Sequence, residues 1–300
     1  MRRREAIQTA AAFGVFGSIA STARAEKGTA DKPWIRKTLK IGMIKVKGSL
    51  ADKFAAAKAA GFEGVEVNVP GVNVDEVTAA AKEAGIIVDG SVINSHWSIR
   101  HTDPDAAVRA KALDHLKRGL EETAGVGGDS ALLVAGHGKD GAPEVVRARS
   151  IENIKLALPT AEKFKVPILI ENVWNHFLYD HGGGQNQSAQ PLADFIDVFD
   201  SPWVGVQFDL GNHWKYGDIA GWIRTLGPRI KKLDIKGFSR AADRFTKITE
   251  GDVDWVGIEA ALREVGFQGW CAAEVGGGDI DRLKEVAGHM EAALHCTVSK

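Results

Sequence analysis

One pattern occurs three times in the 300-residue sequence: AAGFEGVEV at residues 59–67, EAGIIVDG at 83–90 and EVGFQGWCAAEV at 264–275. Each copy joins the end of a helical stretch to a glycine and then to an apolar run. Glycine closes a helix in the left-handed conformation at little steric cost, and a short apolar, β-branched run is typical of a buried strand. The pattern predicts a repeated helix-to-strand connection, as in parallel α/β folds.

The same alternation continues on both sides of these copies, from Leu39 to the end of the chain. Apolar runs predict eight strands, at residues 39–46, 64–69, 86–93, 130–135, 166–171, 204–209, 230–235 and 269–274. Apolar residues spaced by three and four predict eight helices, at residues 50–60, 74–84, 105–124, 150–164, 191–199, 219–226, 255–265 and 280–294. Eight units favour a closed (β/α)8 TIM barrel over an open doubly wound sheet, which has fewer strands and a glycine-rich phosphate turn.

The first 25 residues differ from the rest. Arg2, Arg3 and Arg4 precede a mildly apolar stretch at 10–20, and Ala23-Arg24-Ala25 follows it. This order is typical of a twin-arginine export signal cleaved after Ala25. We therefore expect an exported, periplasmic protein with a signal peptide at 1–25, a linker at 26–37 and a barrel at 38–300. The apolar stretch is too short for a membrane span, and a frayed amphipathic N-terminus is the alternative.

The overall charge gives no reason to expect a polyanionic partner. The formal net charge is -1 at pH 7 and the pI is about 6.8. Proteins that bind nucleic acid concentrate Lys and Arg on one face. We expect a small molecule as the ligand and no nucleic acid, and leave open whether the chain forms a homo-oligomer.

Four carboxylates stand at the ends of four consecutive predicted strands. They are Glu171 in ILIENVW, Asp209 in VQFDLGNHW, Asp234 in KKLDIKG and Glu274 in CAAEVGGGD. Strand ends of a barrel converge on one small volume, and ionised carboxylates gathered there must be neutralised or paired. The pattern predicts a divalent-metal site. Oxygen ligands favour Mg²⁺ or Mn²⁺, and a nearby His would admit Zn²⁺ or Co²⁺. For each acid alone, capping a helix or pairing with a surface Lys is the alternative.

These motifs resemble those of the xylose-isomerase-like barrels of sugar isomerases and epimerases, which include ketose 3-epimerases. In that family, Glu, Asp, His and Glu end strands five to eight and bind one divalent metal, and Glu171, Asp209 and Glu274 match this pattern. Arg240 matches an Arg that ketose 3-epimerases have near the substrate. The segment EGDVDW at 250–255 resembles the loop before the seventh helix.

The chain departs from the family pattern at two positions. Asp234 stands where the family usually has His, and Asn212 stands where many members have a second His. Asp234 adds negative charge, which Lys236 and Arg240 offset if it is a ligand. Alternatively, Asp234 is not a ligand, and His213 or water completes the shell.

The resemblance implies a metal-dependent isomerase or epimerase that moves a proton through an enediolate of a ketose or keto-sugar. Glu171 and Glu274 would then be the catalytic residues. The expected substrate-binding residues at the same face are Glu66, His96, His137, Trp174, His213, Lys236 and Arg240. Three alternatives remain open: a lyase acting on keto-glycosides, a phosphodiesterase like the related endonuclease IV barrels, and a sugar-binding barrel without catalysis.

Overall fold

A computed structural model describes residues 34–296 of the chain. Eight strands form one sheet in the order β1-β10-β7-β6-β5-β4-β3-β2, and every neighbouring pair is parallel. The end strands meet at an isolated parallel bridge between Lys40 and Glu66. The sheet is therefore a nearly closed barrel, which confirms the predicted (β/α)8 fold. Its strands are β1 (Ile35–Leu39), β2 (Gly64–Val69), β3 (Ile87–Ile93), β4 (Ala131–Leu133), β5 (Ile168–Glu171), β6 (Val204–Asp209), β7 (Ile230–Ile235) and β10 (Gly269–Ala273).

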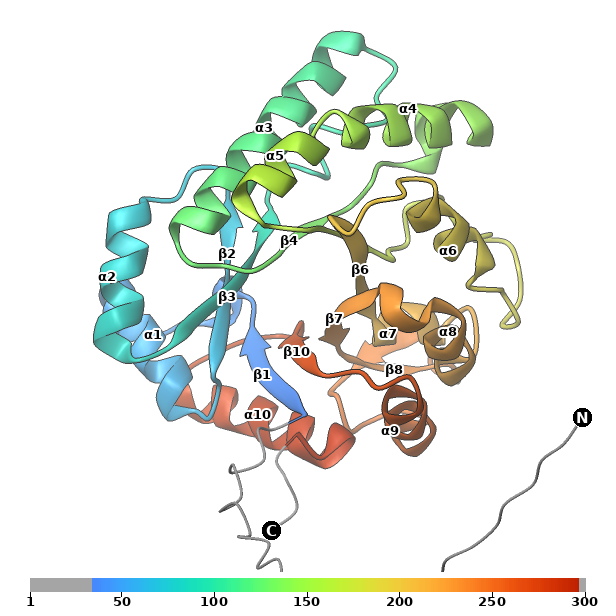
Figure 1. Ribbon diagram of the computed structural model, residues 1–300. Coiled ribbons are helices and arrows are strands. Elements are labelled where there is room, and N and C mark those ends of the chain that lie inside the picture. Colours follow the sequence, from blue (N-terminus) through green and yellow to red (C-terminus); the bar gives the residue numbers. More distant parts are fainter. Residues whose placement is uncertain (1–33, 297–300) are drawn as a thin grey trace, which may run out of the picture. The chain divides into compact units, whose positions relative to one another are not determined.

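Helices between the strands surround this barrel (Figure 1). A short antiparallel hairpin of β8 (Gly237–Ser239) and β9 (Arg244–Thr246) follows β7. None of the helices within residues 34–296 is long and apolar enough to cross a membrane. The helices are α1 (Leu50–Ala59), α2 (Val74–Ala84), α3 (Ala106–Gly125), α4 (Pro143–Lys155), α5 (Leu158–Phe164), α6 (Gln190–Asp197), α7 (Leu210–Trp214), α8 (Ile219–Leu226), α9 (Trp255–Glu264) and α10 (Ile280–Leu294).

The first strand lies earlier than the sequence predicted. The prediction placed it at 39–46, but β1 is Ile35–Leu39, which begins inside the predicted linker at 26–37, and Ile41–Met43 forms a 3₁₀ turn. Two charged residues, Arg36 and Lys37, interrupt the apolar run on which the strand prediction relied. Arg36 pairs with Glu63 and stacks on Trp270, and Lys37 pairs with Glu291, so both charges are balanced at the edge of the barrel. The predicted signal peptide, at 1–25, lies outside the described residues.

The segment between β4 and β5 differs as well. The single helix predicted at 150–164 is two helices, α4 and α5. Pro159 lies in the first turn of α5, where its missing N–H costs no hydrogen bond, whereas in the interior of one long helix it would break the ladder. Pro143 begins α4 in the same way. The short helix α7 and the β8–β9 hairpin were not predicted, because each is too short to show a period.

The interior of the barrel contains a buried ion-pair network. The Lys232 ammonium lies 2.6 Å from Glu66 Oε1 and also binds Asp89, which accepts a hydrogen bond from Thr38. All four side chains are buried. Burial alone would lower the pKa of Lys232, but Asp89 and Glu66 raise it above its ordinary value. Lys232 therefore stays charged and holds β2, β3 and β7 together.

We expect the substitution Lys232→Met to lower the free energy of unfolding by about 3–5 kcal/mol, because it leaves two buried carboxylates without their shared cation. Urea unfolding measures this loss. Lys231→Met, at the exposed neighbouring position of β7, is the control, with a change within about 0.5 kcal/mol. Equal stability of the two variants would contradict the structural role of the network.

Candidate metal centre and ligand cavity

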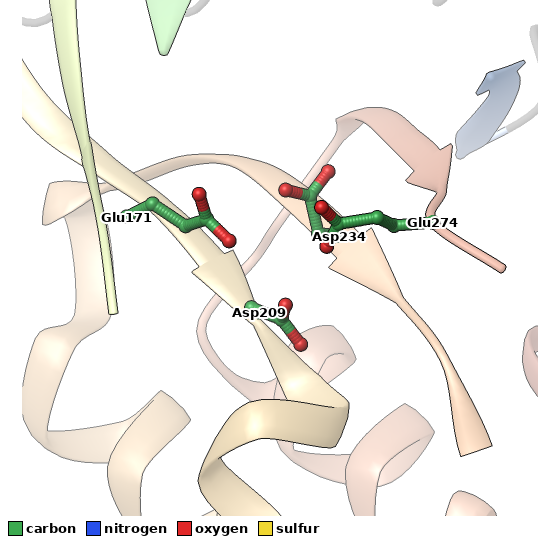
Figure 2. Close-up of side chains that lie close together, drawn as sticks. All are labelled: Glu171, Asp209, Asp234 and Glu274. Atoms are coloured by element: carbon green, nitrogen blue, oxygen red, sulfur yellow. The ribbon is translucent and has the colours of Figure 1, made fainter. Parts of the chain in front are cut away.

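The structure brings the four predicted acids together at the C-terminal ends of the strands. One oxygen atom of each of Glu171, Asp209, Asp234 and Glu274 lies within 4.8 Å of the others. Figure 2 shows their carboxylates gathered in one space between neighbouring strands. Asp209 and Asp234 are fully buried, whereas Glu171 and Glu274 are partly exposed. The two buried acids are held by the barrel, and the two glutamates face its opening.

Local hydrogen bonds fix the two buried acids. Asp209 ends β6 and caps α7, because its Oδ1 accepts a hydrogen bond of 2.8 Å from the Asn212 backbone N–H. Its own backbone N–H donates to Asn172 Oδ1 at 2.7 Å. Asp234 Oδ1 accepts a hydrogen bond of 2.8 Å from Gln207 Nε2. Both carboxylates are therefore oriented before any ligand arrives.

Two lysines lie among the acids. Lys236 Nζ lies 2.7 Å from Asp209 Oδ2 and 2.6 Å from Glu274 Oε2. Lys40 Nζ lies 3.0 Å from Asp234 Oδ1 and 2.6 Å from Glu66 Oε2. Within residues 34–296, the side chain of Glu171 has neither an ion pair nor a hydrogen bond. Glu171 is thus the acid with unused ligand capacity.

The barrel interior has more negative than positive groups. The carboxylates Glu66, Asp89, Glu171, Asp209, Asp234 and Glu274 share it with the ammonium groups of Lys40, Lys232 and Lys236. Six negative and three positive charges leave a net charge of -3 if all are ionised, and one divalent cation would reduce this to -1. Four clustered carboxylate oxygens are the hard ligands that Mg²⁺ and Mn²⁺ prefer. The residues present therefore fit a divalent metal, and no histidine belongs to this cluster within the described part of the chain.

The pKa values of the four acids reflect this crowding. Burial, followed by the charges of Glu274, Asp234 and Asp209, raises the pKa of Glu171 well above its ordinary value. Burial raises the pKa of Asp209 to about 8 and that of Asp234 to about 6, although Lys236 and Lys40, respectively, oppose it. Burial also acts on Glu274, but Lys236 and Lys40 outweigh it and lower its pKa.

A cavity of about 540 Å³ opens beside the acids, within the range of small-ligand sites. Glu171 and Glu274 line it. Trp97 and Phe245 are about half exposed, with exposed fractions of 50% and 45%. The other polar and aromatic residues of the wall are Lys40, Asn68, Asn94, His96, Trp174, Asn212 and Lys236. The wall therefore combines hydrogen-bonding groups with aromatic surfaces.

Three of the predicted substrate-binding residues, His96, Trp174 and Lys236, line this cavity. His96 Nδ1 accepts a hydrogen bond from the Val134 backbone N–H. Burial and the nearby charge of Lys40 lower its pKa to about 3, so the ring is neutral and its Nε2 carries the proton. His96 is thus a hydrogen-bond donor for a ligand.

The other four predicted substrate-binding residues do not line the cavity. Glu66 lies in the ion-pair network beneath it. His213 is fully buried, with its ring 3.5 Å from that of Trp222 and its Nδ1 paired with Tyr179. Arg240 donates to the backbone oxygens of Trp214 and Gly217. His137 Nδ1 accepts from the Lys139 backbone N–H. These contacts support local structure.

The sequence reasoning missed several residues of the wall. Lys40 follows β1, the strand that was placed too late, so its position at a strand end was not recognised. Phe245 belongs to the unpredicted β8–β9 hairpin. Asn68 is an exposed residue inside β2. Lys40 could have been predicted from Thr38, because residues two apart on a strand point to the same face. Once Thr38 is placed inside the barrel, Lys40 is expected on the same side.

An eight-stranded barrel with clustered acids and a ligand-sized cavity at the C-terminal ends of its strands has the architecture of the barrel enzymes. The chain belongs to the xylose isomerase-like TIM barrel family, whose sequence model matches residues 54–293. The family resemblance inferred from the motifs is therefore confirmed.

Solved structures of the same fold include several sugar epimerases. An L-ribulose 3-epimerase superposes with a TM-score of 0.71 at 18% identity, covering 87% of this chain and 95% of the other. A 3-keto-D-glucoside 4-epimerase from E. coli superposes with a TM-score of 0.69 at 18% identity, covering 88% of this chain and 100% of the other. A probable 3-DHS dehydratase from Bacillus anthracis superposes with a TM-score of 0.67 at 16% identity, covering 85% of this chain and 98% of the other. No curated protein matches the chain by sequence.

We expect Mn²⁺ to raise the melting temperature more at pH 8 than at pH 6. The raised pKa values of Asp209 and Asp234 mean that the metal-free folded protein binds more protons than the unfolded chain. Its free energy of unfolding therefore falls as pH rises from about 4 to about 8. Protons and Mn²⁺ compete for the same oxygens, so the ion binds more strongly as the protons leave.

Differential scanning calorimetry of the chelated and Mn²⁺-loaded protein at both pH values measures this difference. The Asp209→Asn variant is the control and should gain little from Mn²⁺ at either pH. An equal gain by the wild type at pH 6 and pH 8 would count against proton competition at the cluster.

Proposed function

We propose that the protein is a divalent-metal-dependent isomerase or epimerase that moves a proton next to the carbonyl of a ketose or keto-sugar. The observation that carries the proposal is the convergence of Glu171, Asp209, Asp234 and Glu274 within 4.8 Å, beside a cavity of about 540 Å³. Family membership supports it. So do the names of structural relatives, which include ketose 3-epimerases and a keto-glucoside epimerase.

Glu171, Asp209, Asp234 and Glu274 would hold the ion, with Mg²⁺ or Mn²⁺ favoured over Zn²⁺ or Co²⁺ because the cluster offers oxygens only. A divalent ion bound there polarises a carbonyl and makes the neighbouring C–H more acidic. The residues of the chain then supply the proton transfers and the orientation of the substrate.

The two glutamates have opposite tendencies, which suits an acid and a base. Without a bound ion, the raised pKa of Glu171 favours its protonated form, and the lowered pKa of Glu274 favours its carboxylate. Pairs of carboxyl groups with separated pKa values divide into acid and base roles. A bound ion would favour the carboxylate form of both residues, so we assign Glu171 and Glu274 as a pair, one removing a proton from one face of the sugar and the other returning a proton to the opposite face. His96, Asn68 and Asn94 would bind sugar hydroxyls, and Trp174 would pack against the ring.

Elimination from a keto-sugar or keto-glycoside is the second candidate function. It begins with the same proton removal next to a carbonyl and continues with loss of a leaving group. The likeness in fold to a probable dehydratase favours it. The same two glutamates would act, with Glu171 placed to protonate the departing oxygen.

Deuterium exchange tests both candidates. We expect the Mn²⁺-loaded protein in D₂O to incorporate deuterium next to the carbonyl of a ketose or keto-glycoside, or to release the aglycone, as followed by NMR. Glu171→Gln and Glu274→Gln should each slow this reaction by about 10²–10⁴-fold, because each removes a group that transfers a proton.

Glu264→Gln is the matched control, since Glu264 pairs with Arg224 on the outside of the barrel. It should retain wild-type exchange. If a broad panel of ketoses and keto-glycosides shows neither exchange nor elimination with the wild type, the result rejects the enzyme proposal and favours a sugar-binding barrel without catalysis.

We also propose that the protein is exported to the periplasm. The support is the order of Arg2, Arg3 and Arg4, the apolar stretch at 10–20 and the small residues before Glu26. We expect N-terminal sequencing of the secreted protein to start at Glu26. Replacing the three arginines with lysine should retain the protein in the cytoplasm, whereas secretion of that variant would contradict the twin-arginine route.

A further inference from the structure

A second cavity of about 500 Å³ adjoins the ligand cavity. The two cavities share Lys236, Phe245 and Glu274 as a common wall. Lys247, Gly276 and Arg282 line only the second one. Because Glu274 belongs to both, a ligand that reacts at the acids can extend past Phe245 without leaving the protein. One sugar ring would leave the second cavity unfilled.

Phe245 presents a fixed aromatic surface between the two cavities. Its ring stacks on Trp174 with centroids 4.9 Å apart and lies 5.4 Å from Phe238, edge to face. These contacts hold β9 in place, yet 45% of the Phe245 residue remains exposed. The apolar face of a sugar ring is a suitable partner for such a surface.

The cations of the second cavity are all ion-paired. Lys247 Nζ lies 2.9 Å and Arg282 Nη1 2.7 Å from the carboxylate of Glu285. Lys247 Nζ also lies 3.7 Å from Glu250 Oε1, so two carboxylates balance these two cations. Lys236 is paired with Asp209 and Glu274. The cavity therefore offers hydrogen-bond donors without a surplus of positive charge. This chemistry suits the hydroxyl groups of a neutral ring better than a phosphate or carboxylate group.

We propose that the second cavity is a subsite for the second ring of a neutral glycoside, whose keto-sugar ring occupies the cavity beside the acids. This inference rests on the proposed function and narrows it, because it selects a two-ring keto-glycoside over a free ketose. Phe245 is then a specificity-determining residue, and Lys247 and Arg282 bind hydroxyl groups of the second ring.

Two glycines allow each cavity to be filled separately. A Cβ atom built on Gly276 or on Gly42 meets nothing within 4 Å, and neither residue has the positive φ that strains other side chains. Gly276 lines only the second cavity and Gly42 only the first. Gly276→Leu should therefore block the second subsite, and Gly42→Leu the first, without disturbing the packing of the barrel.

The experiment measures the affinity of the full Mn²⁺-loaded protein for 3-keto-D-glucose and 3-keto-cellobiose by isothermal titration calorimetry. We expect the wild type to bind 3-keto-cellobiose about tenfold more tightly. Gly276→Leu should abolish this advantage and leave the affinity for 3-keto-D-glucose unchanged. Gly42→Leu should weaken both ligands. Lys247→Ala offers a second variant and should reduce the advantage of the disaccharide by several-fold, as loss of one hydrogen bond implies.

Equal affinities of the wild type for the two sugars, or full retention of the advantage in Gly276→Leu and Lys247→Ala, would overturn the subsite. Tighter binding of D-fructose 6-phosphate than of 3-keto-cellobiose would show that the cavity binds an anion instead. Deuterium exchange in the same samples reports on the proposed function separately. Disaccharide-selective binding without deuterium exchange would support the subsite and reject catalysis. Deuterium exchange without selectivity for the disaccharide would support catalysis and reject the subsite.

Discussion

The enclosure of six carboxylates in one barrel is the constraint on which the rest of the structure depends. Ionised groups in such a low-dielectric space must be paired or protonated. Alternation along β7 and into the residue that follows it places Lys232, Asp234 and Lys236 on the same inward face. Lys232 serves the closed interior, where both of its partners are buried, and Lys236 serves the open end. The same segment therefore stabilises the barrel interior through Lys232 and positions the acids at the open end through Lys236.

The charge of Asp234 on β7 is balanced by neighbouring residues. A carboxylate at position 234 adds a charge that a neutral imidazole would not. Lys40, just after β1, and Gln207, on β6, both bind it. Lys40 also pairs with Glu66, the residue with which it forms the bridge that joins the two ends of the sheet. The placement of the Asp234 carboxylate and the closure of the barrel thus depend on the same lysine.

Most of the barrel and its acidic cluster followed from local sequence, and the rest depended on contacts between distant segments. Helix α2 was predicted with its observed bounds because Asn73 caps its start and Gly85, at φ 64°, ends it. The four acids were found because a strand end fixes which way its side chain points. His213 and Arg240 also follow strand ends, but short unpredicted elements turn them toward Trp222 and Trp214. Side-chain direction after a strand depends on the following loop, which sequence period does not describe.

The two glutamates of the cluster differ in pKa because of a contact that only the folded structure provides. Glu171 and Glu274 both stand at strand ends beside the same cavity. The residues around them in the sequence do not predict which of the two has the higher pKa. Lys236 lies against Glu274 but forms no ion pair with Glu171. A single ammonium group therefore favours the carboxylate of one and leaves the other to hold a proton. Because Lys236 also binds Asp209, a cation that entered the cluster would have to share its carboxylates with this lysine or displace it, and its charge would change the pKa values of both glutamates together.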